Sequence, residues 1–196
     1  MTRTILGVVL AGGESKRFGS PKAFAQKNHI PFYRYSVEAI EPFVNTTIIV
    51  TNPELKPLFA NREDKINIVN DVEPYRGQGP LAGIYTAMNL FAADWYMVVP
   101  VDVPFVKQSV FKILTNYIAE DIDAIVPKVN GKIQPLISLY HHSIKKSIKK
   151  QLDIGERSMH QLLIDKRVIY VPMKENKPVT NINWRKDYHQ FIQTKS

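Results

Sequence analysis

Short apolar, β-branched runs alternate with segments of helical periodicity along the 196-residue chain. Each apolar run is nearly continuous, which is typical of strands that are covered on both faces in a mainly parallel sheet. We expect strands at residues 4–10, 46–51, 66–69, 95–101, 123–126, 135–140 and 168–171. We expect helices at residues 32–40, 54–60, 80–91, 108–119, 143–152, 158–163 and 184–193. The alternation predicts a single three-layer, Rossmann-like α/β domain.

The whole chain, residues 1–196, is expected to form this one domain. Hydrophobic residues make up 44% of it, which is enough to bury a sizeable core. There is no internal repeat and no linker long enough to divide two domains. Residues 172–180 are the most loop-like stretch.

The net charge and the cysteine content restrict the partners and the kinds of site that the chain can have. The chain has 26 Lys and Arg against 18 Asp and Glu, a formal net charge of +8, which favours anionic partners. It has no cysteine, so a disulfide framework, a thiolate nucleophile and a cysteine-based metal site are excluded. Neither a signal peptide nor a run of about 18 apolar residues is present, and we expect a cytoplasmic protein without membrane contact.

A glycine-rich segment follows the first expected strand, at residues 10–22. Gly12 and Gly13 allow backbone N–H groups to turn towards an anion, and Lys16, Arg17 and Lys22 add positive charge. The spacing matches neither the P-loop nor the Gly-x-Gly-x-x-Gly pattern. The segment therefore predicts a phosphate-binding loop of another kind, with a glycine-rich surface turn as the alternative.

Two further groups of polar residues follow the third and fourth strands along the chain. Asp71 precedes a Gly-rich entry, residues 77–79, into a helix that starts with Pro80, and this arrangement favours close approach of a flat or anionic ligand. Asp102 ends an apolar strand and is followed by Pro104. One carboxylate with substrate phosphates is a common Mg²⁺ site, so Asp102 is the expected metal ligand, with a helix cap as the alternative.

Residues 10–22 resemble the L-A-G-G-x-S-x-R-x-G-x-x-K signature of nucleotidyltransferases that activate small phosphorylated molecules. The likeness is greatest to the molybdenum cofactor guanylyltransferase branch of the MobA-like nucleotidyltransferases, although Phe18 stands where the family usually has Met. A Gly-Pro-Leu-x-Gly segment at residues 79–83 and a Val-Asp-Val-Pro segment at residues 101–104 extend the resemblance. Its specific motifs lie in a nucleotide-binding half, about residues 1–105, and an acceptor-binding half is expected at about 106–196.

The resemblance implies a fold of the nucleotide-diphospho-sugar transferase type and transfer of GMP from GTP to molybdenum-molybdopterin, with Mg²⁺ as cofactor. It implies catalytic roles for Lys22, Arg17 and Asp102. The nucleotide-binding residues that it implies are Leu10, Ala11, Gly12, Gly13, Lys22, Asn52, Asp71, Gly79 and Asp102. We expect a monomer that binds no nucleic acid. Transient contacts with other proteins of molybdenum cofactor biosynthesis or with acceptor proteins are compatible with this expectation.

Signals for the acceptor half are weaker. Gln134, Arg157, Asn181 and Asn183 lie in segments similar to those that line the acceptor side in the family, and each is equally consistent with a turn or a helix cap. The lysine-rich stretch at 145–150 is typical of an amphipathic surface helix.

Alternative functions remain open from the sequence. A cytidylyltransferase acting on molybdopterin, or a nucleotidyltransferase acting on a sugar or polyol phosphate, would use the same loop. A basic nucleic-acid-binding module would explain the net charge but would leave the loop and Asp102 without a purpose.

Overall fold

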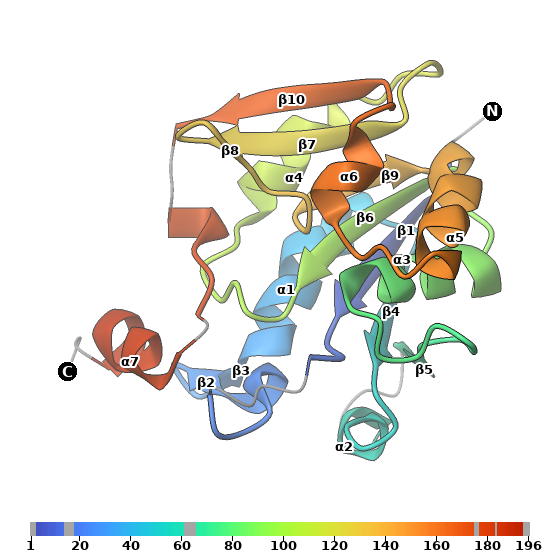
Figure 1. The fold of residues 1–196 in the computed structure, drawn as a ribbon. Helices are drawn as coiled ribbons and strands as arrows, with labels where there is room; N and C mark the ends of the chain where they lie inside the picture. The colour runs from blue at the N-terminus through green and yellow to red at the C-terminus, as the bar shows by residue number, and fades with distance from the viewer. Residues whose placement is uncertain (1–2, 14–17, 61–65, 175–176, 183, 194–196) are drawn as a thin grey trace.

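The structure is a computed structural model that describes residues 3–13, 18–60, 66–174, 177–182 and 184–193. Its centre is an eight-stranded sheet with helices on both faces (Figure 1). The strands of this sheet are β1 (Ile5–Leu10), β4 (Thr46–Thr51), β5 (Asn67–Asn70), β6 (Trp95–Pro100), β7 (Ala124–Val129), β8 (Lys132–Ile133), β9 (Ser138–His141) and β10 (Val168–Met173). The expected α/β fold with a mainly parallel sheet is confirmed.

The strand order is β10-β7-β9-β6-β1-β4-β5, and β8 pairs with β7. Strands β6, β1, β4 and β5 run parallel to one another, and β10 runs parallel to β7. Strand β9 is antiparallel to both of its neighbours. The carboxyl ends of β6, β1, β4 and β5 therefore meet at one edge of the sheet, where ligands bind in open α/β sheets.

Helices cover the sheet in two layers. The α-helices are α1 (Phe32–Ile40), α2 (Lys56–Ala60), α3 (Pro80–Leu90), α4 (Gln108–Thr115), α5 (Lys145–Asp153), α6 (Met159–Leu163) and α7 (Arg185–Tyr188). Helices α1, α2 and α4 contribute to one apolar cluster, and α3, α5 and α6 contribute to the other. Figure 1 shows α3 and α5 side by side on their face of the sheet.

The two clusters explain the continuous apolar runs in the sequence. Successive strand residues point to opposite faces, so Val8 packs in the α3 cluster while Val9 packs in the α1 cluster. Val98 and Val99 divide in the same way. A strand that is buried on both faces needs an apolar residue at every position.

Several element boundaries differ from the sequence prediction. Strand β9 begins at Ser138 rather than at 135, because residues 135–137 form a turn in which Ile137 N–H donates to the Gln134 carbonyl. Helix α4 ends at Thr115 rather than at 119, in tight turns closed by N–H groups of residues 116–118. Helix α2 begins two residues late and α3 ends one residue early. The short strands β2 (Gln26–Lys27), β3 (Ile30–Pro31) and β8 were not predicted.

The C-terminal segment crosses to the N-terminal part of the molecule. The helix expected at 184–193 is α-helical only in α7 and continues as a π-helix, η5 (His189–Gln193). The Tyr188 hydroxyl donates to the Gln26 carbonyl at 2.6 Å, and the Tyr188 ring packs against Phe18 and Phe32. The chain end thereby covers the region around the β2–β3 hairpin (Figure 1).

None of the helices in the described part of the chain is long and apolar enough to cross a membrane.

Candidate active site

A cavity of about 1120 Å³ opens at the carboxyl ends of β6, β1, β4 and β5. The β1 strand ends between its two neighbours: Ala11 N–H donates to the Val50 carbonyl at 2.8 Å, and Val101 N–H donates to the Leu10 carbonyl at 3.2 Å. The loops that follow these four strands form the walls. All nine predicted nucleotide-binding residues line this cavity, namely Leu10, Ala11, Gly12, Gly13, Lys22, Asn52, Asp71, Gly79 and Asp102.

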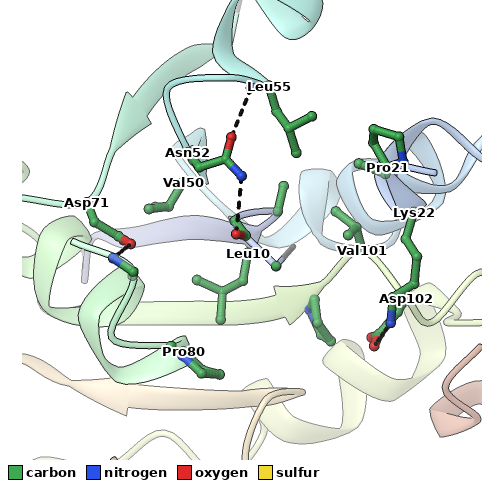
Figure 2. A pocket seen from close by; sticks show the side chains of 18 of the residues that line it. Leu10, Pro21, Lys22, Val50, Asn52, Leu55, Asp71, Pro80, Val101 and Asp102 are labelled. Carbon is green, nitrogen blue, oxygen red and sulfur yellow. Dashed lines mark hydrogen bonds and ion pairs between the residues drawn. The ribbon is translucent and has the colours of Figure 1, made fainter. Parts of the chain in front are cut away.

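Asn52 holds two loops together. Its side-chain Nδ2 donates to the Gly12 carbonyl at 3.4 Å, and its Oδ1 accepts the N–H of Leu55 at 2.9 Å (Figure 2). The Thr51 hydroxyl adds a bond to the Ala11 carbonyl at 3.3 Å. Asn52 therefore shapes the wall of the cavity through both ends of its amide. Arg17 lies outside the described residues.

Asp71 follows β5 and faces the cavity from the side opposite Lys22 and Asp102 (Figure 2). Its Oδ2 accepts the N–H of Gly77 at 3.1 Å. Burial raises the pKa of Asp71, although the Gly77 N–H and the Arg76 charge oppose that shift. A half-buried carboxylate of this kind is suited to accept hydrogen bonds from a ligand.

The entry to α3 forms the neighbouring wall. Gly79 precedes the helix with φ +79° and ψ −163°, a conformation that is essentially restricted to glycine, and Pro80 occupies the first turn. Gly83, one turn later, lies against β1: a Cβ at this position would be 2.7 Å from Leu10 Cδ2. The small residue lets α3 approach the strand that carries the glycine loop.

Lys22 and Asp102 form an ion pair across the other end of the cavity. Lys22 Nζ lies 3.3 Å from Asp102 Oδ2, and the two side chains are 18% and 19% exposed (Figure 2). Burial raises the pKa of Asp102 more than the Lys22 charge lowers it. Asp102 Oδ1 is buried and has no hydrogen-bond partner among the residues that the structure describes.

Asp102 is not a helix cap. The next helix, α4, begins at Gln108, and its N-cap is Lys107. Instead the backbone of Asp102 is held by the C-terminal segment, because Ile182 N–H donates to the Asp102 carbonyl at 2.7 Å. This contact joins residues far apart in the sequence, and no pattern in the sequence pointed to it.

Three of the predicted acceptor residues, Gln134, Arg157 and Asn181, lie outside the cavity lining. Gln134 and Arg157 do not line it, although Leu136, two residues after Gln134, does. Asn181 is exposed and precedes Ile182, which places it next to the backbone of Asp102. Asn183 lies outside the part of the chain that the structure describes. Sequence reasoning missed one group of lining residues after β4: Pro53, Glu54 and Leu55.

The cavity thus combines two kinds of chemistry. One side offers a carboxylate and a glycine-rich helix entry, which can recognise the edge of a flat heterocycle. The other side offers a cation, a glycine loop and a carboxylate oxygen that has no partner in the described part of the chain, and these groups can hold phosphates and a hard cation. Binding of a nucleoside triphosphate needs both sets of groups, because the ligand has a flat base and a chain of phosphates.

The family model described as "MobA-like NTP transferase domain" matches residues 7–168. A probable molybdenum cofactor guanylyltransferase of Geobacillus sp. is 42% identical over 165 residues, 84% of each chain. One of Bacillus cytotoxicus is 34% identical over 98% of each chain. The solved structure of molybdopterin-guanine dinucleotide biosynthesis protein A from Archaeoglobus fulgidus has a TM-score of 0.78 at 24% identity, covering 96% of this chain and 97% of its own, and shows the same fold.

Proposed function

Because the chain belongs to the family of MobA-like NTP transferase domains, we propose that it transfers GMP from GTP to molybdenum-molybdopterin and releases pyrophosphate. The relatives named molybdenum cofactor guanylyltransferase support the choice of substrates. The observation that carries the proposal is the single cavity that Asp71 lines together with Lys22 and Asp102.

The reaction is a displacement at the α-phosphorus of GTP. An oxygen of the acceptor's terminal phosphate forms a bond to that phosphorus, and the bond to the bridging α–β oxygen breaks. Pyrophosphate leaves with the electron pair. The attacking phosphate is already ionised near neutral pH, so the protein's task is to align the groups and to neutralise charge rather than to remove a proton.

Each wall of the cavity has a part in this proposal. Asp71 accepts hydrogen bonds from the guanine edge, and Asn52 keeps the neighbouring loop in place. Backbone N–H groups around Gly12 and Gly13, with Arg17, hold the β- and γ-phosphates. Lys22 turns from Asp102 towards the α-phosphoryl group and neutralises the charge that develops there.

The residues fit a Mg²⁺ ion. Asp102 Oδ1 is a buried oxygen without a partner in the described structure, as expected of a ligand atom whose partner is an ion. No group of three or more His, Cys, Asp and Glu that could hold a metal occurs among the described residues, so Asp102 and the substrate phosphates would share the coordination. Bound there, Mg²⁺ supplies Lewis-acid stabilisation of phosphate charge.

Nucleotide-dependent thermal stabilisation tests the base preference. A nucleotide at about 100 times its dissociation constant adds about 2.7 kcal/mol to the free energy of unfolding. With Mg²⁺ present, GTP should raise the Tm by about 5–10 °C, and CTP, UTP and ATP should raise it less at the same concentration. A larger shift with CTP would reject the guanylyl assignment and favour a cytidylyltransferase.

A further inference from the structure

The loop at residues 71–79, between β5 and α3, carries three residues that line the cavity: Asp71, Gly77 and Gly79. Hydrogen bonds within the loop fold it on itself. Tyr75 N–H donates to the Val72 carbonyl at 3.0 Å, and Gln78 N–H donates to the Tyr75 carbonyl at 3.1 Å. Tyr75 is therefore at the centre of the segment that presents Asp71 to a ligand.

The Tyr75 side chain anchors this loop away from the cavity. It is 4% exposed and packs edge-on against Tyr85 of α3, with ring centroids 5.2 Å apart. Its hydroxyl donates a short hydrogen bond to Oδ1 of Asp153, the last residue of α5. The bond joins two residues 78 positions apart in the chain.

Lys149 is the third residue of this hydrogen-bonded group, after Tyr75 and Asp153. It lies one turn before Asp153 on α5, and its Nζ donates to Asp153 Oδ2 at 2.8 Å. Hydrogen bonds from Lys149 and Tyr75 lower the pKa of Asp153, and the bond to Asp153 raises the pKa of Tyr75. Tyr75 thus remains the proton donor and Asp153 the acceptor.

The hydroxyl has a geometric effect more than an energetic one. Lys149 and Asp153 are half exposed, and ion pairs of that kind add little to stability. A phenylalanine could fill the same apolar space against Tyr85. The hydroxyl additionally ties the ring to the end of α5, and the ring belongs to the loop that carries Asp71 and Gly77.

We propose that Tyr75, held by Asp153 and Lys149, is a positioning residue for recognition of the nucleotide base. This inference rests on the proposed function, in which Asp71 contacts guanine. It acts on binding alone, because Lys22 and Asp102 stand on the far side of the cavity and their loops make no hydrogen bond to Tyr75 among those described.

The test replaces the hydroxyl alone, in Tyr75→Phe. The KM for GTP and the directly measured Kd for GTP should each rise about threefold to tenfold, the range that one hydrogen bond allows, while kcat stays within about twofold. Asp153→Ala should reproduce this effect. Asp153→Asn keeps an oxygen that can accept from Tyr75 and should restore a KM near that of the wild type.

Tyr96→Phe is the matched control. Tyr96 is also buried, and its hydroxyl donates to the Phe91 carbonyl at 2.7 Å, at the opposite end of the sheet from the cavity. This variant should lower the Tm at least as much as Tyr75→Phe does and leave the KM for GTP unchanged. A purely structural role for the Tyr75 hydroxyl predicts that both variants behave alike.

The outcomes separate the two proposals. If the wild type uses GTP and Tyr75→Phe keeps its KM and Kd, the positioning role is wrong and the function stands. If the wild type binds another nucleotide in preference to GTP, the guanylyl assignment is wrong, and the Kd ratio for that nucleotide decides the role of Tyr75. If the wild type binds no nucleoside triphosphate, both are wrong.

Discussion

Replacing Asp102 by asparagine separates the chemical role of its carboxylate from its contribution to stability. The side chain keeps its shape, but it loses the charge that faces Lys22 at 3.3 Å and the anionic Oδ1 that has no partner among the described residues. We expect turnover to fall by about 10² to 10³, the loss typical of one preorganised electrostatic contact. The Mg²⁺ concentration required for half-maximal rate should rise.

The expected change in stability is small. Two charges 3.3 Å apart attract by about 5 kcal/mol at an effective dielectric constant of about 20, and the burial of each costs several kcal/mol. These effects nearly cancel. Lys22 also lines the cavity, so its ammonium can reach water once the carboxylate is gone. The free energy of unfolding of Asp102→Asn should stay within about 1 kcal/mol of the wild-type value, equivalent to about 2–4 °C in Tm.

The pH dependence gives the assay a second readout. Burial raises the pKa of Asp102, so the folded protein binds this proton more tightly than the unfolded chain does. The wild type therefore loses stability as the pH rises through the raised pKa, and Asp102→Asn does not. Urea unfolding at a series of pH values should show the stability of the variant increasing relative to that of the wild type.

Asp123→Asn is the matched control for that readout. Burial alone would raise the pKa of Asp123, but hydrogen bonds from Arg167 and Ser143 outweigh it and hold the pKa at about 2. The stability that Asp123 contributes is present above the unfolded pKa and is lost as the pH falls through the folded pKa of about 2, so this variant should lose about 2 kcal/mol at neutral pH and progressively less as the pH falls towards 2. The reasoning about Asp102 is refuted if both variants show the same slope with pH, or if Asp102→Asn keeps wild-type rates at every Mg²⁺ concentration.

Two further substitutions test the two walls of the cavity. Lys22→Ala should lower kcat by about 10² or more with a small change in Tm. The control Lys146→Ala, on the exposed face of α5, should change neither kcat nor Tm. A kcat for Lys22→Ala within about threefold of the wild-type value would remove Lys22 from the mechanism. Gly83→Ala should push Leu10 into the cavity and weaken GTP binding. The overpacking should also lower the free energy of unfolding by about 1–3 kcal/mol. Gly7→Ala makes a similar clash, 2.8 Å from Ile40 Cδ1 on the α1 face, so calorimetry should show a loss of stability without a loss of GTP affinity.

The strands were predictable from local sequence, and the cavity residues were predictable from their place after the strands together with the resemblance to the family. Apolar residues at every position marked the doubly covered strands, and the polar residues directly after β1, β4, β5 and β6 all reach the same edge of the sheet. The roles of these residues stay predictions. The antiparallel direction of β9 was not predictable, because a short apolar run looks the same in either direction.

Contacts between distant segments could not be read from the sequence. The Ile182 N–H that holds the Asp102 carbonyl and the Tyr75 hydroxyl bond to Asp153 each join residues more than 70 positions apart. The C-terminal π-helix shares its apolar pattern with an ordinary helix end and differs from it in its i→i+5 backbone hydrogen bonds, which the sequence does not show. The cap alternative for Asp102 also needed the structure, which places the start of α4 six residues later.

The most direct test of the central claim follows the phosphorus atom itself. GTP labelled at the α-phosphorus is incubated with the protein, Mg²⁺ and molybdenum-molybdopterin, and the label and the pyrophosphate are quantified. The account predicts that label enters the cofactor as a guanine dinucleotide, with one pyrophosphate released per label transferred, and that Asp102→Asn slows both together. Faster transfer from labelled CTP, or release of pyrophosphate with no label in the cofactor, would contradict it.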